Sequence, residues 1–246
     1  MPPKPQQRVA PANQYAPDAT PKIGRIIFHI GVAAAIFDGF WGLQNLALTK
    51  DYIGTQYGGH FQYLTILGLF GTIITMFLSG ICDYLPAVQA IKTFKRVFLL
   101  FALPVEIVIS TIYWAIILAA PHLMLPPNPD LTSSPEPSSS NAEEPLFRIP
   151  LLMDLSMHAL PAAALIIDFF FLEKKFKAPA STYGAFALAA TFGAGYSIWV
   201  EHCASINGAF PYPFLTIMNP QQRIIMYVGS TFMAWAVFRG LNALHK

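Results

Sequence analysis

The chain has 246 residues, of which 54% are hydrophobic and 11% are charged, and its mean hydropathy is +0.48. A soluble domain carries about 25% charged residues, so 15 basic and 13 acidic side chains exclude a water-facing surface of this size. Two cysteines and 16 glycines exclude a disulfide-rich scaffold and a collagen-like chain, and a net charge of +2 indicates no nucleic-acid partner.

Residues 1–22 form a polar, proline-rich segment without the apolar run and cleavage pattern of a signal peptide. We expect this segment to be a disordered cytoplasmic tail, because it has too little apolar surface to bury.

Six apolar runs follow the tail, and each is close to the ~20 residues that a helix needs to cross a bilayer. They cover residues 23–48, 61–82, 97–120, 149–172, 182–203 and 222–240. Backbone inside hydrocarbon must satisfy its own hydrogen bonds, and the runs lack the alternation of barrel strands. The sequence therefore predicts an all-α polytopic membrane protein with six transmembrane helices, formed by residues 23–246.

The segment between the third and fourth runs, residues 121–148, holds seven prolines, five serines and four acidic residues. This composition is typical of a flexible loop rather than of a folded domain. With six crossings, the loop is predicted to face the lumen or the outside of the cell.

The basic residues predict the orientation of the helices. Six crossings place twelve of the fifteen on the side that holds both termini, and leave only Lys50, Arg148 and Arg223 on the other side. Cytoplasmic segments carry an excess of lysine and arginine, so both termini are predicted to be cytoplasmic. The endoplasmic reticulum or the plasma membrane is the expected location, and nothing in the sequence indicates an oligomeric state.

Ionisable residues inside apolar runs are costly and suggest function. Five acids and two histidines in the runs are the candidates: Asp38, Glu106, Asp154, Asp168, Glu201, His158 and His202. Three of the acids also have a structural interpretation: Asp168 would snorkel or pair with a lysine, and Asp38 and Glu106 would pair across helices.

A chamber in the lumenal half of the membrane is predicted from the remaining residues. Asp154 and His158 are four residues apart and so share one helix face. Thr65 lies near the lumenal start of the second run, and Glu201 and His202 lie near the lumenal end of the fifth. These residues also have structural interpretations. Thr65 would bond the carbonyl one turn back, His158 would pack between helices, and Glu201 and His202 would face solvent.

Three chemistries use such a set of residues. A hydroxyl nucleophile with a histidine base and a carboxylate would perform acyl transfer. The same histidines and acids would hold a metal ion, although no HExxH or tight Cys/His spacing supports this. They would also form a proton or substrate pathway, although paired inverted repeats are absent from the sequence.

A resemblance to a known family arises at these residues. Residues 57–65, Tyr-Gly-Gly-His-Phe-Gln-Tyr-Leu-Thr, resemble the segment that opens the second span of the androgen-induced protein family, which includes the androgen-dependent regulator of tissue factor pathway inhibitor. Met157-His158 followed by Leu160-Pro161 resembles its fourth span. Residues 195–199, 212–215 and 223–225 resemble its C-terminal third, so the similarity covers about residues 23–246.

The resemblance implies a six-span threonine hydrolase that cleaves fatty acid esters of hydroxy fatty acids, with Thr65 as nucleophile and His158 as catalytic base. It does not extend to Asp154, Glu201 or His202, and the long acidic loop departs from the family. Asp154 as the residue that orients the histidine is therefore our own expectation. Oxyanion donors are expected among Asn45, Tyr63 and Tyr196.

The predicted function is thus an intramembrane lipid-ester hydrolase that needs no cofactor or metal and whose partners are its lipid ester and the surrounding membrane lipids. The alternative is a non-enzymatic lipid-binding, transport or regulatory membrane protein in which the same residues line a pocket.

Overall fold

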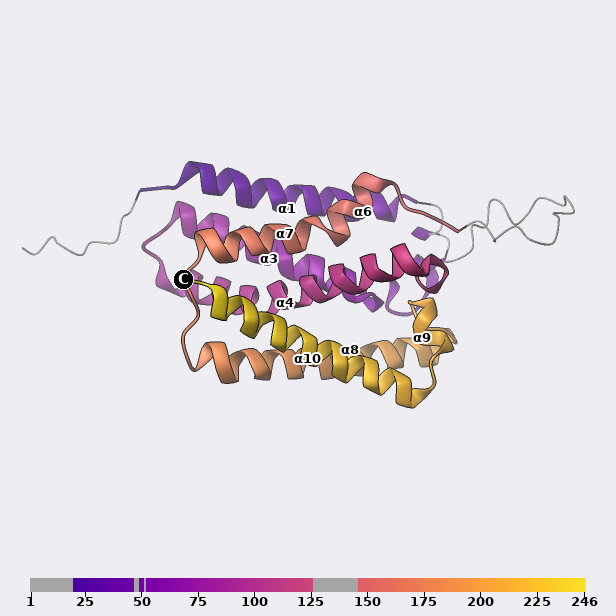
Figure 1. The fold of residues 1–246 in the computed structure, drawn as a ribbon. Helices are drawn as coiled ribbons and strands as arrows, with labels where there is room; N and C mark the ends of the chain where they lie inside the picture. Colours follow the sequence, from indigo (N-terminus) through magenta and orange to yellow (C-terminus); the bar gives the residue numbers. More distant parts are fainter. Residues whose placement is uncertain (1–19, 47–48, 51, 126–145) are drawn as a thin grey trace, which may run out of the picture.

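In the computed structural model the described parts of the chain, residues 20–46, 49–50, 52–125 and 146–246, are almost entirely helical (Figure 1). The predicted tail lies outside the described residues except for residues 20–22, and so does most of the predicted loop. An all-helical fold is therefore confirmed where the chain is described.

The described residues form eight α-helices and several short 3₁₀ and π-helical turns. The α-helices are α1 (Ile23–Gln44), α3 (Leu64–Tyr84), α4 (Gln89–Ala119), α6 (Leu151–His158), α7 (Leu160–Ile167), α8 (Ala185–Asn207), α9 (Pro213–Ile217) and α10 (Pro220–Leu244) among the described residues. The turns are η1 (Ile53–Thr55), η2 (Gly59–Gln62), η3 (Pro121–Leu123), η4 (Asp168–Leu172) and η5 (Ala180–Gly184).

Four of the described helices, α1, α3, α4 and α10, are long and apolar enough to cross a membrane. The fourth predicted run is bent by 42° between α6 and α7, and it makes a fifth span if the bent pair counts as one. The helix α8 has 23 residues but is less apolar and is not among these candidates. The structure thus supports a membrane protein of four or five spans, and the sixth span stays a prediction.

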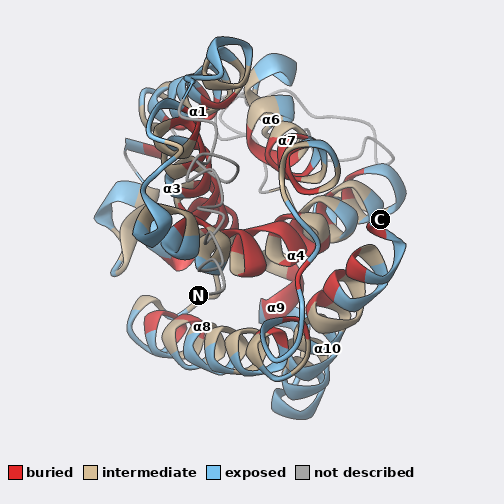
Figure 2. Ribbon diagram, turned by 90° about the vertical axis from the view of Figure 1, so that its left-hand side faces the viewer, coloured by how far each residue is buried: buried red, intermediate tan, exposed pale blue. Residues whose placement is uncertain are grey.

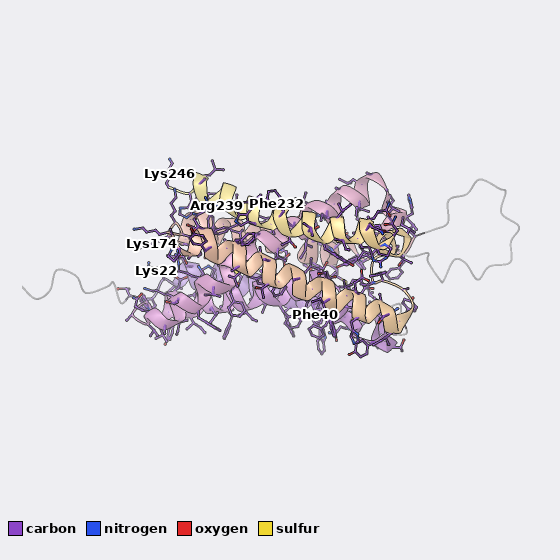
Figure 3. All side chains as sticks on the ribbon, turned by 90° about the horizontal axis from the view of Figure 1, so that it is seen from below. Lys22, Phe40, Lys174, Phe232, Arg239 and Lys246 are labelled. Carbon is purple, nitrogen blue, oxygen red and sulfur yellow. The ribbon has the colours of Figure 1, made fainter. Side chains whose placement is uncertain are left out.

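The two ends of the described chain lie at the same end of the bundle, because α1 begins where α10 ends (Figure 1). Figure 3 shows Lys22, Lys174, Arg239 and Lys246 gathered at that end. This arrangement agrees with an even number of crossings. The assignment of the basic end to the cytoplasm stays a prediction.

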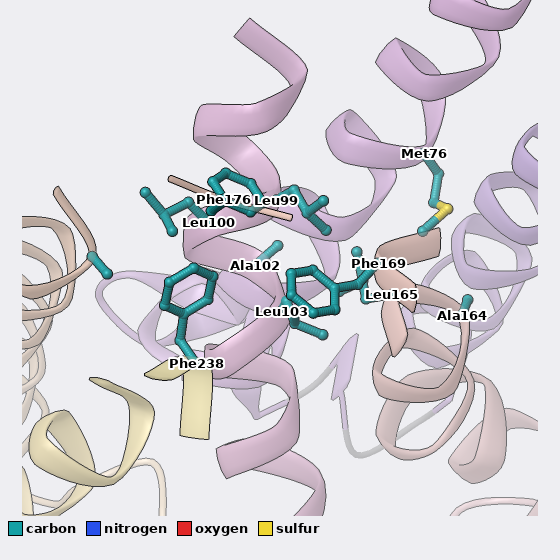
Figure 4. Close-up of a cluster of buried hydrophobic side chains, with 11 residues drawn as sticks. Met76, Leu99, Leu100, Ala102, Leu103, Ala164, Leu165, Phe169, Phe176 and Phe238 are labelled. Carbon is teal, nitrogen blue, oxygen red and sulfur yellow. The ribbon is translucent and has the colours of Figure 1, made fainter. Parts of the chain in front are cut away.

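The helix α4 lies between two groups of helices (Figure 2). It packs against the pair formed by α8 and α10 on one side, and against α3, α6 and α7 on the other. Its half nearer the basic end supplies Leu99 and Leu103 to a buried core that also contains Leu165, Phe169 and Phe238 (Figure 4). The two groups are therefore held together by a core near the basic end of the bundle.

A buried ionic cluster lies beside this core. Asp168 is fully buried, and its carboxylate oxygens lie 2.8 Å from Lys95 Nζ and 3.1 Å from His29 Nε2. The other ring nitrogen of His29 lies 3.0 Å from Asp83, and Lys95 also contacts Glu173 at 2.8 Å. The predicted pairing of Asp168 with a lysine is confirmed, and the cluster ties α1, α3, α4 and η4 together.

The two remaining acids differ. Glu106 is buried between α4 and α3, where its Oε1 accepts a hydrogen bond of 3.2 Å from Thr72 Oγ1. The predicted pairing across helices is therefore confirmed for Glu106. It is wrong for Asp38, which lies exposed on the outer face of α1 and has no bonding partner in the described ranges.

Candidate functional site

A cavity of about 600 Å³ lies between α4 and the α8–α10 pair and extends to α3 and α6, and loops line its end away from the basic end of the bundle. Its wall includes both residues that the family resemblance implicates, Thr65 and His158. No Asp, Glu, Lys or Arg lines it among the described residues. The cavity is therefore an apolar chamber with a few polar groups, as ligand sites usually are.

Thr65 lies at the second position of α3 and is almost fully buried. Two carbonyls of the preceding turn, those of Phe61 and Gln62, accept hydrogen bonds from α8. The Trp199 indole N–H donates to the Phe61 carbonyl at 2.9 Å, and the Tyr196 hydroxyl donates to the Gln62 carbonyl at 3.1 Å. In the described structure Thr65 makes no bond to the preceding turn. Its side chain instead lines the cavity and interacts with Tyr212.

Tyr212, from the segment before α9, lies against the start of α3. Its hydroxyl accepts a 2.9 Å hydrogen bond from the Leu64 N–H and faces the Thr65 side chain. Burial raises the pKa of Tyr212, so its hydroxyl remains protonated at neutral pH. A protonated phenol is thus placed beside the threonine.

Two glycines shape the turn that leads into α3. Gly58 and Gly59 have φ angles of +83° and +48°, a region that glycine adopts without strain. A Cβ atom on Gly58 would lie 2.8 Å from Cys203 Sγ, so the turn also approaches α8 closely. The glycine pair in the family-like segment therefore has a structural role in placing Thr65.

Replacing Gly58 by alanine is expected to destabilise the protein by about 1–3 kcal/mol, because it adds backbone strain and a clash with Cys203. Thermal unfolding in detergent measures the effect. Gly195→Ala is the matched control: Gly195 lies within α8 with open space around it, and alanine there should be neutral or stabilising. Equal unfolding temperatures for the two variants would contradict this explanation.

His158 ends α6, next to the bend in the fourth run. Pro161 lacks an N–H, and α6 is interrupted at Ala159, whose φ is −126°. The carbonyl of His158 accepts a hydrogen bond from the Trp114 indole N–H at 3.2 Å. The bend therefore lies at the histidine itself and is supported by α4.

The imidazole of His158 is held on two sides. Its Nδ1 lies 2.7 Å from Asp154 Oδ1, and its ring stacks on Tyr113 with centroids 3.5 Å apart and planes within 5°. Asp154 also faces the Tyr113 hydroxyl. No hydrogen bond joins His158 to Thr65 in the described residues, as is common for catalytic pairs without substrate.

The structure brings five of the predicted site residues together. Thr65, His158, Tyr63 and Tyr196 line the cavity, and Asp154 contacts the histidine from behind.

Three predicted site residues do not line the cavity. Asn45 is exposed, and its side chain donates to the Trp41 carbonyl at 3.0 Å. The carboxylate of Glu201 pairs with Arg223 at 2.7 Å, whereas His202 is exposed and packs against Tyr57. The expectation that Glu201 and His202 share the chamber is not met, because Glu201 is paired with Arg223 and His202 is exposed.

Two residues at the site were not selected from the sequence, namely Tyr113 and Tyr212. Tyr113 carries no sequence signal, since an aromatic residue in an apolar run is usually a packing residue. Tyr212 belongs to a segment that resembles the family, and that resemblance was its only signal. In the described chain, no three His, Cys, Asp or Glu residues are placed to hold a metal ion.

Comparison with known proteins agrees with this picture. A family model described as FAR-17a/AIG1-like protein matches residues 24–246. A UPF0641 membrane protein of Schizosaccharomyces pombe is 27% identical over 78% of each chain, and another of Saccharomyces cerevisiae is 25% identical over 83% of this chain and 84% of its own. No solved structure matches the chain significantly. The chain therefore belongs to the FAR-17a/AIG1-like family of membrane proteins.

Proposed function

We propose that this protein is an intramembrane hydrolase of lipid esters, with fatty acid esters of hydroxy fatty acids as the substrates that the family resemblance implies. The observation that carries the proposal is the shared apolar cavity, which is lined by both Thr65 and His158, whose imidazole is supported by Asp154. We place the enzyme in the endoplasmic reticulum or the plasma membrane.

The hydrogen bond to Asp154 defines the role of the imidazole. A carboxylate at Nδ1 requires that nitrogen to carry the proton, which leaves Nε2 as the basic nitrogen. His158 accepts the proton of the Thr65 hydroxyl as the oxygen attacks the ester carbonyl, and it then protonates the departing hydroxy fatty acid. Water, deprotonated by the same imidazole, hydrolyses the acyl-threonine ester and releases the fatty acid.

Tyr212 is the best-placed donor for the oxyanion that forms during attack. Its hydroxyl is protonated, lies beside Thr65 and is anchored by the Leu64 N–H. Tyr63 packs edge-on against Tyr212 with ring centroids 5.4 Å apart and also lines the cavity. The hydroxyl of Tyr196 is less suited as an oxyanion donor, because it donates its hydrogen bond to the Gln62 carbonyl.

Covalent labelling tests the proposal directly. A fluorophosphonate probe is expected to modify Thr65 in the detergent-purified protein, with the adduct located by peptide mass spectrometry. Labelling should disappear in His158→Ala, because a threonine hydroxyl without a base is a weak nucleophile.

Thr75→Ala is the matched control: Thr75 lies on the same helix, is buried, and donates to the Gly71 carbonyl at 2.7 Å outside the cavity. Its labelling should equal that of the unmodified protein. A protein that binds the branched ester but never forms the adduct would favour the non-enzymatic alternative, a lipid-binding or transport protein.

A further inference from the structure

The cavity extends well beyond the proposed reaction site. Along α4 it continues from Tyr113, beside His158, to Phe101, twelve positions nearer the basic end. We call this extension the inner arm; its wall includes Phe101, Val105 and Ile112 of α4 and Ala189 and Phe192 of α8. At ~1.5 Å per residue the inner arm is about 18 Å long.

The inner arm ends on a tightly packed floor. The rings of Phe101 and Phe192 meet there with centroids 3.8 Å apart. Phe101 packs against the buried core that contains Leu100 and Leu103. Close-packed interiors resist displacement, so this floor limits how far an occupant can reach.

The dimensions and chemistry of the arm suit one occupant. Its length slightly exceeds the ~15 Å of a single bilayer leaflet, which is the depth that long acyl chains fill. The absence of Asp, Glu, Lys and Arg from the described cavity lining disfavours a charged group in the arm. We propose that the inner arm holds the acyl chain of the ester, and that Phe101 and Phe192 set the longest chain that the protein cleaves.

The effects on hydrolysis rates that we expect from this inference rest on the proposed hydrolase function. The acyl carbonyl must reach Thr65 while the chain lies in the arm. A chain that is too long for the arm therefore holds the carbonyl away from the hydroxyl, and misplacement by about 1 Å can cost on the order of a hundredfold in rate.

The test uses Ala189→Phe, which adds a ring at the basic end of the arm, three residues before Phe192 on α8. The matched control is Ala187→Phe, because Ala187 lies on the same helix, is exposed and does not line the cavity. The probes are 4-nitrophenyl esters of butanoic, octanoic, hexadecanoic and docosanoic acid, so that the leaving group stays constant. Phe101→Ala, which opens the floor, is measured in the same series.

Ala189→Phe is expected to lower kcat/KM for the hexadecanoyl ester by about a hundredfold and to leave the butanoyl ester nearly unchanged. Phe101→Ala should raise the rate with the docosanoyl ester relative to the hexadecanoyl ester. The control should follow the unmodified protein for every chain length. Equal losses for short and long chains in Ala189→Phe, or no loss at all, would overturn the proposal.

A binding readout separates this inference from the proposed function. Hexadecanoic acid with a terminal diazirine is expected to cross-link to the peptides that carry Phe101 and Phe192 in the unmodified protein, and not in Ala189→Phe. If no ester is hydrolysed but this cross-linking pattern holds, the hydrolase proposal fails and the acyl-chain site stands. Cross-linking that is insensitive to Ala189→Phe would refute the site itself.

Discussion

Replacing Thr65 by alanine is expected to lower kcat/KM for a branched fatty acid ester by roughly 10⁴-fold, and replacing His158 by alanine should have a similar effect. The reason is that the nucleophile and its base act as one unit, so loss of either removes the covalent route. The double variant should therefore be no slower than the single variants. Steady-state hydrolysis by detergent-purified protein measures all three.

Two further variants make this prediction specific. Thr65→Ser keeps a hydroxyl at the start of α3 and should retain most of the activity. Asp154→Asn should cause a smaller loss than His158→Ala, because Asp154 positions the imidazole through Nδ1 and does not touch the substrate. Full activity in a folded Thr65→Ala variant would rule out the mechanism, and additive losses in the double variant would argue for independent roles.

Replacing Asp168 by alanine is expected to destabilise the protein by about 3 kcal/mol, the largest stability effect that we foresee. The carboxylate is fully buried and contacts both Lys95 and His29. Its removal leaves these groups with fewer partners in a water-free region, where an incompletely paired charge is costly. Thermal or denaturant-induced unfolding in detergent gives the value, and residual ester hydrolysis at low temperature shows that the site remains intact.

Asp38→Ala is the matched control for this substitution. Asp38 is also an acid in an apolar run, but it is exposed and makes no ion pair within the described residues, so its loss should be neutral or stabilising. In the double variant Asp168→Leu with Lys95→Met, stability should partly recover, since apolar pairs often replace buried ion pairs without loss. A double variant that is less stable than Asp168→Ala would show that the cluster stabilises the fold in another way.

Helix by helix, the sequence predicted the local structure well. Most of the predicted runs lie close to an observed helix or bent pair, because burial of apolar side chains and internal backbone hydrogen bonding are local requirements in a membrane. The contact between Asp154 and His158 was also within reach of the sequence, since residues four apart share a helix face. The bend at His158 has a visible cause in Pro161.

Contacts between distant segments were harder to predict. The partner of Glu201 is Arg223, a residue on the next long helix, and it turns a candidate site residue into half of an ion pair. The two carbonyls of the turn before Thr65 accept hydrogen bonds from Trp199 and Tyr196 of α8, and not from the threonine. Such competition between hydrogen-bond donors has no signature in a linear pattern.

The scarcity of charge and the distribution of fifteen basic residues were enough to indicate a helical membrane protein with a basic end, because composition and hydropathy act on each segment separately. The cavity, the Tyr113 stack on His158 and the position of Tyr212 beside Thr65 depended on tertiary packing. They arise where α4 meets α8 and α10 and where loops close over them. The positions of these side chains relative to one another depend on the crossing angles and side-chain volumes of several helices at once, which no single segment specifies.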